Sequence, residues 1–182
     1  VVIIAKNEAH NLPRCLESVL DLADEMVVVD SGSTDGTLEV CVRHGATVHQ
    51  REFTTYADQK NWAADQASQP YVLSLDADES LGDDLFKELL AWKTRVASAD
   101  ECPFDAWSMP RLTSYLGMWV RHGGWYPDRK IRLWCQGTGS WKPAHQGGML
   151  HEAWEPNVPS RVAKFEGDLH HHSYHRFSDH LR

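Results

Sequence analysis

Several signals that would assign this chain to a common class are missing from it. Its four cysteines lie far apart and form no C-x-x-C pair, which argues against a zinc ribbon or a dense disulfide framework and favours a reducing cytoplasm. No apolar run approaches the length of a membrane-spanning helix, and no signal peptide is visible. The net charge of −8, with most acids in the first half, lacks the basic footprint that nucleic-acid binding needs.

The composition that remains is that of one globular domain. The 182 residues are 42% hydrophobic and 24% charged, which is enough for a sizeable core. The sequence begins in an apolar run without Met and stops at Leu181-Arg182 in a helix-like segment. We therefore expect both termini to be truncated, and targeting or membrane-anchoring segments beyond them stay open.

The first 80 residues alternate between short apolar runs and amphipathic segments. Strands are expected over residues 1–5, 26–29, 46–49 and 71–75, and helices over residues 12–20, 37–44, 56–67 and 85–96. After Cys102-Pro103 the pattern changes to short strand-like runs separated by loops rich in glycine and proline. The chain is therefore expected to be an α/β domain with a mostly parallel sheet, right-handed crossovers and a smaller β-rich part.

Acidic side chains follow three of these strands, at Glu8, at Asp30 and at the pair Asp76 and Asp78. Because ligands of open α/β sheets bind outside the carboxyl ends of the strands, these acids predict a crevice at one edge of the sheet. In extended backbone, Asp76 and Asp78 point the same way and are able to share one Mg²⁺ or Mn²⁺ ion with substrate phosphates. The alternative is that one of them caps a helix beginning near Gly82.

The loop after the second strand, residues 31–37, consists of small polar residues. Its backbone is suited to approach a ligand closely, and Asp30 is suited to accept hydrogen bonds from a nucleobase or ribose. The loop lacks the G-K-[ST] ending of a P-loop and the G-x-G-x-x-G fingerprint of dinucleotide-binding proteins. A capped turn without a ligand is the competing interpretation.

The second half leaves several interpretations open. Residues 151–155 begin like H-E-x-x-H but have Glu155 in place of the second His, which argues against a zinc protease. The histidines between His170 and His180 allow a separate transition-metal site or a solvated surface. Aromatic residues suited to stack on sugars, or to ordinary core packing, are Trp119, Trp125, Tyr126, Trp134 and Trp141. A loosely basic zone, compatible with an anionic lipid-linked acceptor or a membrane surface, comprises Arg111, Arg121, Arg129, Lys130 and Arg132.

Four motifs stand in order along nearly the whole chain: VIIAKNE at residues 2–8, VDSGSTDGT at 29–37, LSLDADE at 73–79 and YPDRKIRLW at 126–134. They resemble the successive motifs of family 2 glycosyltransferases with the GT-A fold, and most of all those of the bacterial branch that includes lipopolysaccharide-core β-glucosyltransferases. The resemblance implies a Rossmann-like three-layer sandwich with a mostly parallel central sheet. Residues 1–100 would form the nucleotide-sugar-binding half, and residues 101–182 the acceptor-binding half, of a single domain.

The resemblance also implies which residues bind the donor. Glu8 and Asp30 match positions that hold the nucleoside, with Asp30 near the base. Asp76 matches the first acid of the D-x-D motif, near the ribose and diphosphate, and Lys60 matches a basic residue that accompanies the donor. The residues expected to steady phosphate, or else to form exposed ion pairs, are Arg129 and Arg132.

The metal and the base are implied in the same way. Asp78 matches the acid that binds a divalent metal, Mg²⁺ or Mn²⁺, and His171 matches a late His that completes the metal site. A slip of register would put His170 or His172 there instead. Glu152 matches the acceptor-side position of the catalytic base, which takes the proton from the attacking hydroxyl.

The function implied is an inverting transfer of a sugar from a nucleotide diphosphate, a UDP-hexose, to a saccharide or lipid-linked acceptor in bacterial envelope or lipopolysaccharide-core synthesis. Such an enzyme would be cytoplasmic, with a peripheral contact on the cytoplasmic face of the inner membrane. One alternative is a catalytically silent nucleotide- or sugar-binding domain of the same fold. Another is a sugar-phosphate nucleotidyltransferase, whose Gly-rich basic signature is absent after Ala5.

Overall fold

The computed structural model describes residues 1–97, 103–143, 152–157 and 161–174. The first half alternates strands and helices: β1 (Val2–Ala5), α1 (Leu12–Val19), β2 (Val27–Asp30), α2 (Thr37–Arg43), β3 (Thr47–Gln50), α3 (Tyr56–Asp65), β4 (Tyr71–Asp76), β5 (Glu79–Leu81) and α4 (Asp83–Ala97). The second half contributes strands: β6 (Ala106–Tyr115), β7 (Met118–Trp119), β8 (Asp128–Cys135), β9 (Gly139–Pro143), β10 (Glu152–Pro156), β11 (Val162–Lys164) and β12 (Leu169–Tyr174).

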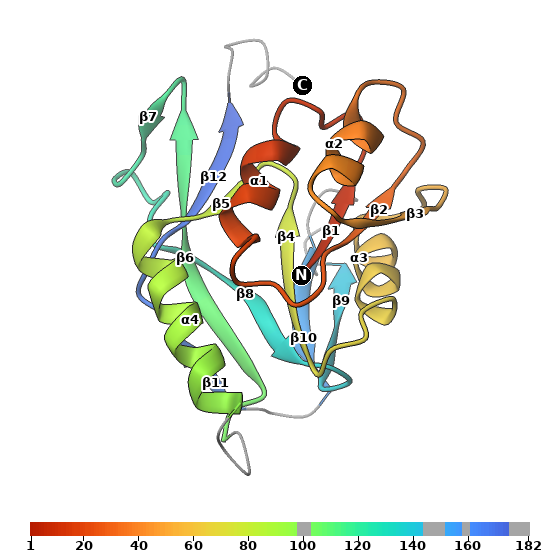
Figure 1. Ribbon diagram of the computed structural model, residues 1–182. Helices are drawn as coiled ribbons and strands as arrows, with labels where there is room; N and C mark the ends of the chain where they lie inside the picture. The colour runs from red at the N-terminus through yellow and green to blue at the C-terminus, as the bar shows by residue number, and fades with distance from the viewer. Residues whose placement is uncertain (98–102, 144–151, 158–160, 175–182) are drawn as a thin grey trace.

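One ten-stranded sheet runs through both halves of the chain, in the order β3-β2-β1-β4-β8-β6-β12-β5, with β7 and β11 paired to β6 (Figure 1). Strands β3, β2, β1 and β4 are parallel. Strand β8 then runs antiparallel between β4 and β6, so that β4 and β6 point in the same direction. The expected α/β domain with a mostly parallel sheet is confirmed.

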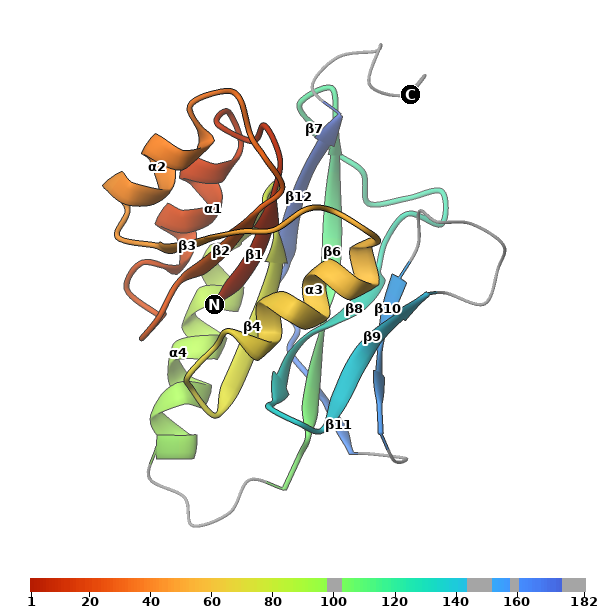
Figure 2. The same ribbon diagram turned by 90° about the vertical axis from the view of Figure 1, so that its right-hand side faces the viewer.

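Helices cover the sheet on both faces, which gives the three layers. Helices α1, α2 and α4 lie on one face, and α3 lies on the other beside the separate β9–β10 hairpin (Figures 1 and 2). Successive residues of a strand pack against opposite helical layers, because side chains alternate between the two faces of a sheet. Ile3 and Val28 pack in the core under α1, α2 and α4, whereas Val2 and Val27 pack toward α3.

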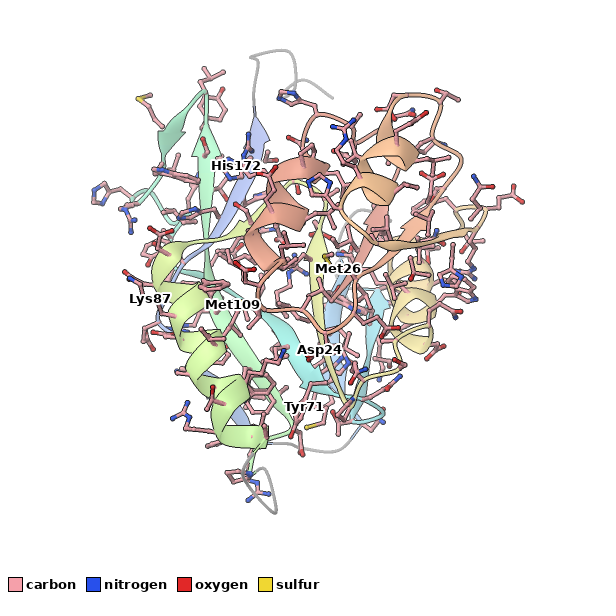
Figure 3. All side chains as sticks on the ribbon, viewed as in Figure 1. Asp24, Met26, Tyr71, Lys87, Met109 and His172 are labelled. Atoms are coloured by element: carbon pink, nitrogen blue, oxygen red, sulfur yellow. The ribbon has the colours of Figure 1, made fainter. Side chains whose placement is uncertain are left out.

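Helix α4 shows how the sequence specifies this packing. The helical spacing predicts that Leu85, Leu89, Trp92 and Val96 point inward. The first three are buried, and Val96 is partly buried against the same core. They share a core with Met109 of β6, labelled in Figure 3. Of the cysteines in the described part of the chain, Cys15 and Cys41 are buried free thiols, as expected for small apolar core residues.

The capping interpretation of the acidic motif is wrong. Strand β5 separates Asp76 and Asp78 from the start of α4 at Asp83. The carboxylate of Asp76 instead contacts Lys60 and that of Asp78 contacts His171. The residues that follow β4 are therefore strand and site rather than a helix start.

Candidate functional site

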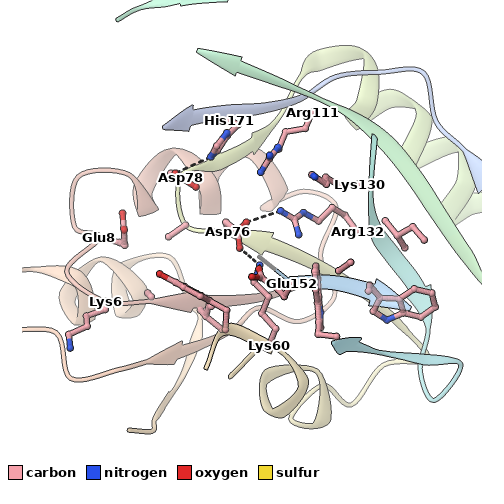
Figure 4. Close-up of a pocket in the computed structure, with 18 of the residues that line it drawn as sticks. Lys6, Glu8, Lys60, Asp76, Asp78, Arg111, Lys130, Arg132, Glu152 and His171 are labelled. Carbon is pink, nitrogen blue, oxygen red and sulfur yellow. Dashed lines mark hydrogen bonds and ion pairs between the residues drawn. The ribbon is translucent and has the colours of Figure 1, made fainter. Parts of the chain in front are cut away.

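A cleft of about 810 Å³ opens where β1 and β4 end at the carboxyl edge of the sheet (Figure 4). Both halves of the chain line it. The residues predicted for the site that line this cleft are Glu8, Lys60, Asp76, Asp78, Arg129, Arg132, Glu152 and His171. Groups up to 163 positions apart in the sequence therefore meet in one place.

Two loops form the wall next to β1, and hydrogen bonds join them. Asn7 has a φ of 57°, a conformation that Asn adopts more readily than most residues, and its side chain accepts from the backbone N–H of Thr34 at 2.8 Å. The N–H of Glu8 donates to the Thr37 hydroxyl at 2.8 Å, and that of Ala9 to Asp35 at 3.1 Å. These bonds fix where the Glu8 side chain enters the cleft.

Glu8 and Asp30, the two acids expected at the nucleoside, differ in their surroundings. Glu8 lines the cleft half-buried, and burial raises the pKa of its carboxyl, although a hydrogen bond from Asn11 at 3.0 Å opposes this. Asp30 is fully buried and does not line the cleft. Its carboxylate accepts the backbone N–H groups of Gly32 and Ser33 at 3.0 Å and so shapes the 31–36 loop. A direct contact between Asp30 and a base stays a prediction.

Helix α3 is fastened to the site by three consecutive residues. Gln59 is buried and donates to the Ser31 hydroxyl at 3.0 Å. Asn61 exchanges two hydrogen bonds with the backbone of Trp141 in β9, at 2.9 and 2.8 Å. Lys60, between them, is held with only 2% of its surface exposed and points into the cleft (Figure 4).

Lys60 links the acid of β4 to the acid of β10. Its Nζ lies 2.7 Å from Asp76 Oδ1 and 2.5 Å from Glu152 Oε1 (Figure 4). The other oxygen of Asp76 accepts from Arg132 at 2.7 Å. Burial alone would raise the pKa of Asp76, but Arg132 and Lys60 outweigh it and hold that pKa well below its usual range. Asp76 is therefore ionised between two cations.

Arg132 reaches the cleft because of an irregularity in β8. The pairing with β6 passes from Trp107–Leu133 to Ser108–Ile131, which leaves Arg132 without an opposite residue. Such a bulge re-aims one side chain. Arg132 is 3% exposed and donates to Glu79 at 2.6 Å, and Glu79 in turn accepts the backbone N–H of Asp76 at 3.0 Å. Glu79 thereby fixes the positions of the Arg132 side chain and the Asp76 backbone.

His171 is the histidine that faces the D-x-D motif. Its Nε2 lies 3.3 Å from Asp78 Oδ2, and its Nδ1 lies 3.2 Å from the Thr113 hydroxyl. His170 and His172 lie on the other face of β12, where both rings contact Trp119. Strand alternation therefore selects His171 from the three neighbours.

The donor set is compatible with a divalent metal held jointly with a substrate. Within the described ranges, no three His, Cys, Asp or Glu side chains are grouped so as to hold a metal by themselves. Mg²⁺ is usually bound by one or two protein carboxylates, with substrate phosphates and waters completing its shell. Asp78 supplies a hard oxygen, and Thr113 orients His171 as outer partners of metal-binding histidines do.

The remaining cations of β6 and β8 are paired. Arg129 donates to the Phe165 carbonyl at 2.9 Å and to Glu166 at 2.6 Å. Arg111 and Lys130 both contact Asp128, at 2.7 and 2.9 Å. All three cations line the cleft, with these carboxylates as their partners.

Two tryptophans, Trp141 and Trp154, line the cleft, and only Trp141 was singled out from the sequence. The Lys60 ammonium lies 4.5 Å from the Trp141 ring centre. Trp154 stacks on Trp134 behind it. Of the five aromatic residues singled out from the sequence, Trp134 and Trp141 are buried, while Trp119 and Trp125 are 40% and 38% exposed. The role of Glu79 was also missed, although its place in the D-A-D-E run was a signal.

Comparison with known structures identifies the fold. S. aureus TarS, residues 1–349, superposes over 94% of this chain and 59% of its own with a TM-score of 0.62 at 15% identity. Its complex with UDP matches 62% of this chain and 35% of its own, with a TM-score of 0.50 at 24% identity. The layered, mostly parallel sheet of this chain thus has the GT-A fold.

The family follows from the sequence match. Residues 1–115 match Glycosyl transferase family 2, and the chain belongs to that family. The lipopolysaccharide core biosynthesis glycosyltransferase LpsC of Rhizobium meliloti is 34% identical over 80% of this chain and 54% of its own length. An uncharacterized glycosyltransferase of Rickettsia typhi, RT0209, is 34% identical over 63% of this chain and 38% of its own. The chain thus spans about half or less of the length of these relatives.

None of the helices in the described part of the chain is both long and apolar enough to cross a bilayer.

Proposed function

We propose that this chain transfers a hexose from UDP to a hydroxyl group of a saccharide or lipid-linked acceptor, with inversion at the anomeric carbon. The observation that carries the proposal is the single cleft in which Asp78, His171 and Glu152 meet. A UDP-sugar donor is supported by the fold relative TarS, which has been crystallised with UDP and with UDP-GlcNAc. Membership of glycosyl transferase family 2 supports the reaction class.

The donor is proposed to lie along the half formed by residues 1–100. Glu8 and Ser31 line that side of the cleft, and Phe53 and Tyr56 add aromatic surface there. Their rings pack edge to face, 5.0 Å apart, and each is 40% exposed, which leaves apolar area for a ring of the substrate. Asp30 acts on this side by shaping the loop that carries Ser31.

Asp78 and His171 are proposed to hold Mg²⁺ or Mn²⁺ together with the diphosphate. The metal, when bound, neutralises the charge that develops on the UDP leaving group. Arg132 and Lys60 hold Asp76 ionised beside it. Arg129 is proposed to exchange Glu166 for a substrate phosphate, since an arginine fork binds carboxylate and phosphate alike.

Glu152 is proposed to be the catalytic base. It enters the cleft from β10, and Asp76 lies between it and Asp78 in the close-up of Figure 4. Its carboxylate is held by Lys60, which fixes the position from which it takes the proton of the attacking hydroxyl. A single displacement with the donor on one side and this base on the other inverts the anomeric centre.

The acceptor side is proposed to be the half formed by residues 101–182, where Arg111 and Lys130 line the cleft. Their charge suits an anionic saccharide or lipid-linked acceptor. The likeness to LpsC supports a role in envelope or lipopolysaccharide-core synthesis, carried out in the cytoplasm at the inner membrane.

Release of UDP from UDP-glucose, UDP-galactose and UDP-GlcNAc, with and without Mn²⁺, tests the proposal. The Asp78→Asn variant should lose the Mn²⁺-dependent part of UDP binding. Glu152→Gln should bind UDP normally and turn over roughly 10²-fold more slowly. The exposed acid Asp65, at the end of α3, provides the matched control Asp65→Asn, which should behave as wild type.

A catalytically silent sugar-nucleotide-binding domain would bind UDP and release none from any of these donors. That result, with a folded protein and measurable UDP affinity, would contradict the transferase and leave the binding site standing. Near-normal turnover of Glu152→Gln would assign the base elsewhere.

A further inference from the structure

The turn between β6 and β7 exposes apolar side chains to solvent. Leu116, Met118 and Trp119 are 44%, 69% and 40% exposed, and Trp125 is 38% exposed. They are four of the eleven large hydrophobic side chains exposed in the described part of the chain, and they fall within ten residues. Exposed apolar side chains gathered in one short segment indicate a contact with a partner or a membrane.

The backbone of this turn is costly for the residue at its tip. Leu116 and Gly117 have φ values of 51° and 81°, as a two-residue hairpin turn requires. Asn, Asp and Gly take such positions readily, whereas a positive φ is rare for a branched apolar residue. A leucine in this conformation, in place of a polar turn residue, points to a function for its exposed side chain.

Acidic residues are absent from this segment. The chain has 26 Asp and Glu residues, yet residues 112–127 include none. The segment has one arginine, Arg121, which is 51% exposed and reaches Asp168 at 3.1 Å at the base of the hairpin. Its tip, residues 116–120, has no charged side chain. An uncharged tip with Trp and Arg behind it has the composition of surfaces that lie at the membrane–water interface.

The hairpin stands at the same edge of the sheet as the cleft. Because β6 points in the direction of β4, the turn projects beyond the edge where Asp76 and Asp78 lie (Figures 1 and 2). Arg111 of β6 lines the cleft, and Leu116 follows it by five residues, which is roughly 17 Å of extended chain. A planar surface touching the tip would therefore lie close to the cleft.

We propose that the β6–β7 turn is a membrane-docking element that places Leu116, Met118 and Trp119 in the interfacial layer of a lipid bilayer. The Trp119 ring contacts the His170 ring, with 4.5 Å between ring centres, and this contact fixes the orientation of Trp119. The inference rests on the proposed function in one respect only: docking would bring the cleft to a lipid-linked acceptor. Vesicle binding is measurable without any transfer, so the two proposals fail independently.

Co-sedimentation of the 182-residue chain with phosphatidylcholine vesicles, with and without phosphatidylglycerol, provides the test. The double variant L116S/M118S should partition roughly tenfold more weakly, because two apolar side chains no longer leave water. The matched control is V42S/L90S, which removes two apolar side chains that are 74% and 43% exposed elsewhere. The control should sediment as wild type does, and both variants should keep the wild-type melting temperature and UDP release.

Three results would overturn the proposal. One is a wild-type chain that sediments with neither vesicle. Another is equal binding by L116S/M118S and wild type to vesicles with phosphatidylglycerol, which would assign the contact to charge elsewhere. The third is a dimer of the wild-type chain that L116S/M118S loses while vesicles bind neither, since the apolar tip would then cover a second copy.

Discussion

At the scale of single residues, the cleft is organised by one buried lysine. Lys60 is 2% exposed and contacts two carboxylates, Asp76 and Glu152, that belong to different strands. The family resemblance assigned Lys60 to the donor, whereas its contacts also join Glu152, the proposed base, to Asp76, the proposed donor-side acid. Removing a buried ion-pair partner leaves the other charge uncompensated, which is the larger cost.

Lys60→Met should therefore lower the free energy of unfolding by roughly 3 kcal/mol, because two close carboxylates lose their shared cation. Glu152→Gln should lower it less, and adding Glu152→Gln to Lys60→Met should recover part of the loss, which a double-mutant cycle in urea measures. If Lys60 acted on the donor alone, Lys60→Met would weaken UDP binding and leave stability unchanged.

Glu8 makes a second prediction, about pH. Burial raises the pKa of its carboxyl in the folded protein above the pKa in the unfolded chain. The free energy of unfolding therefore decreases as the pH rises through the range between these two pKa values. Glu8→Gln should melt at a higher temperature than wild type at pH 7, and the difference should vanish as the pH falls toward the ordinary Glu value of about 4.3. UDP affinity should decrease in the same variant. A melting difference independent of pH would contradict the assignment to ionisation.

At the scale of elements, the sequence predicted the helices and strands whose apolar residues form a clear run or a clear helical spacing. Apolar runs gave β1, β2 and β4, and spacing on one face gave α1 and α4. Strands β5, β7, β9, β10 and β12 were missed because they are short or polar. Strand β12 reads L-H-H-H-S-Y, which has no apolar alternation, and it is a strand because β6 and β5 flank it.

The residues of the candidate site were also only partly predictable from the sequence. The acids at strand ends were predictable, because each follows an apolar run in the sequence. The contact between Lys60 and Glu152 was not, since 92 residues separate them and no local pattern connects α3 to β10. The position of Arg132 was also hidden, because a β-bulge, and not alternation, aims its side chain.

The close approach of the β11–β12 loop to α4 makes a prediction at this scale. A Cβ on Gly167 would lie 2.3 Å from the backbone nitrogen of Leu85, so the loop or the helix would have to move. Gly167→Ala should cost about 1–3 kcal/mol and lower the melting temperature by roughly 2–10 °C. Gly36→Ala is the control, because its Cβ would meet Ala9 at an ordinary 3.7 Å. Equal effects of the two substitutions would contradict this account.

At the scale of the whole molecule, the two halves of the chain meet across the cleft and share one sheet. A ligand that spans the cleft binds only the folded chain, and so it raises the melting temperature. In the presence of Mn²⁺, UDP at 100 times its dissociation constant should raise the free energy of unfolding by about 2.7 kcal/mol. The melting temperature should then rise by roughly 5–10 °C. With Mn²⁺ omitted, or with Asp78→Asn, most of that increase should disappear. An equal increase without the metal would contradict its role.

Strand β12 is the last described strand to leave the ribosome, yet it lies inside the sheet, between β6 and β5. Strand β5, which directly follows Asp78, has no other neighbour in the sheet across the described residues. A nascent chain stopped before residue 169 would thus leave the segment after the acidic motif without its strand partner and without His171. Synthesis must pass residue 171 before the two proposed metal ligands face one another, so a product that stops before this residue should lack the proposed metal site.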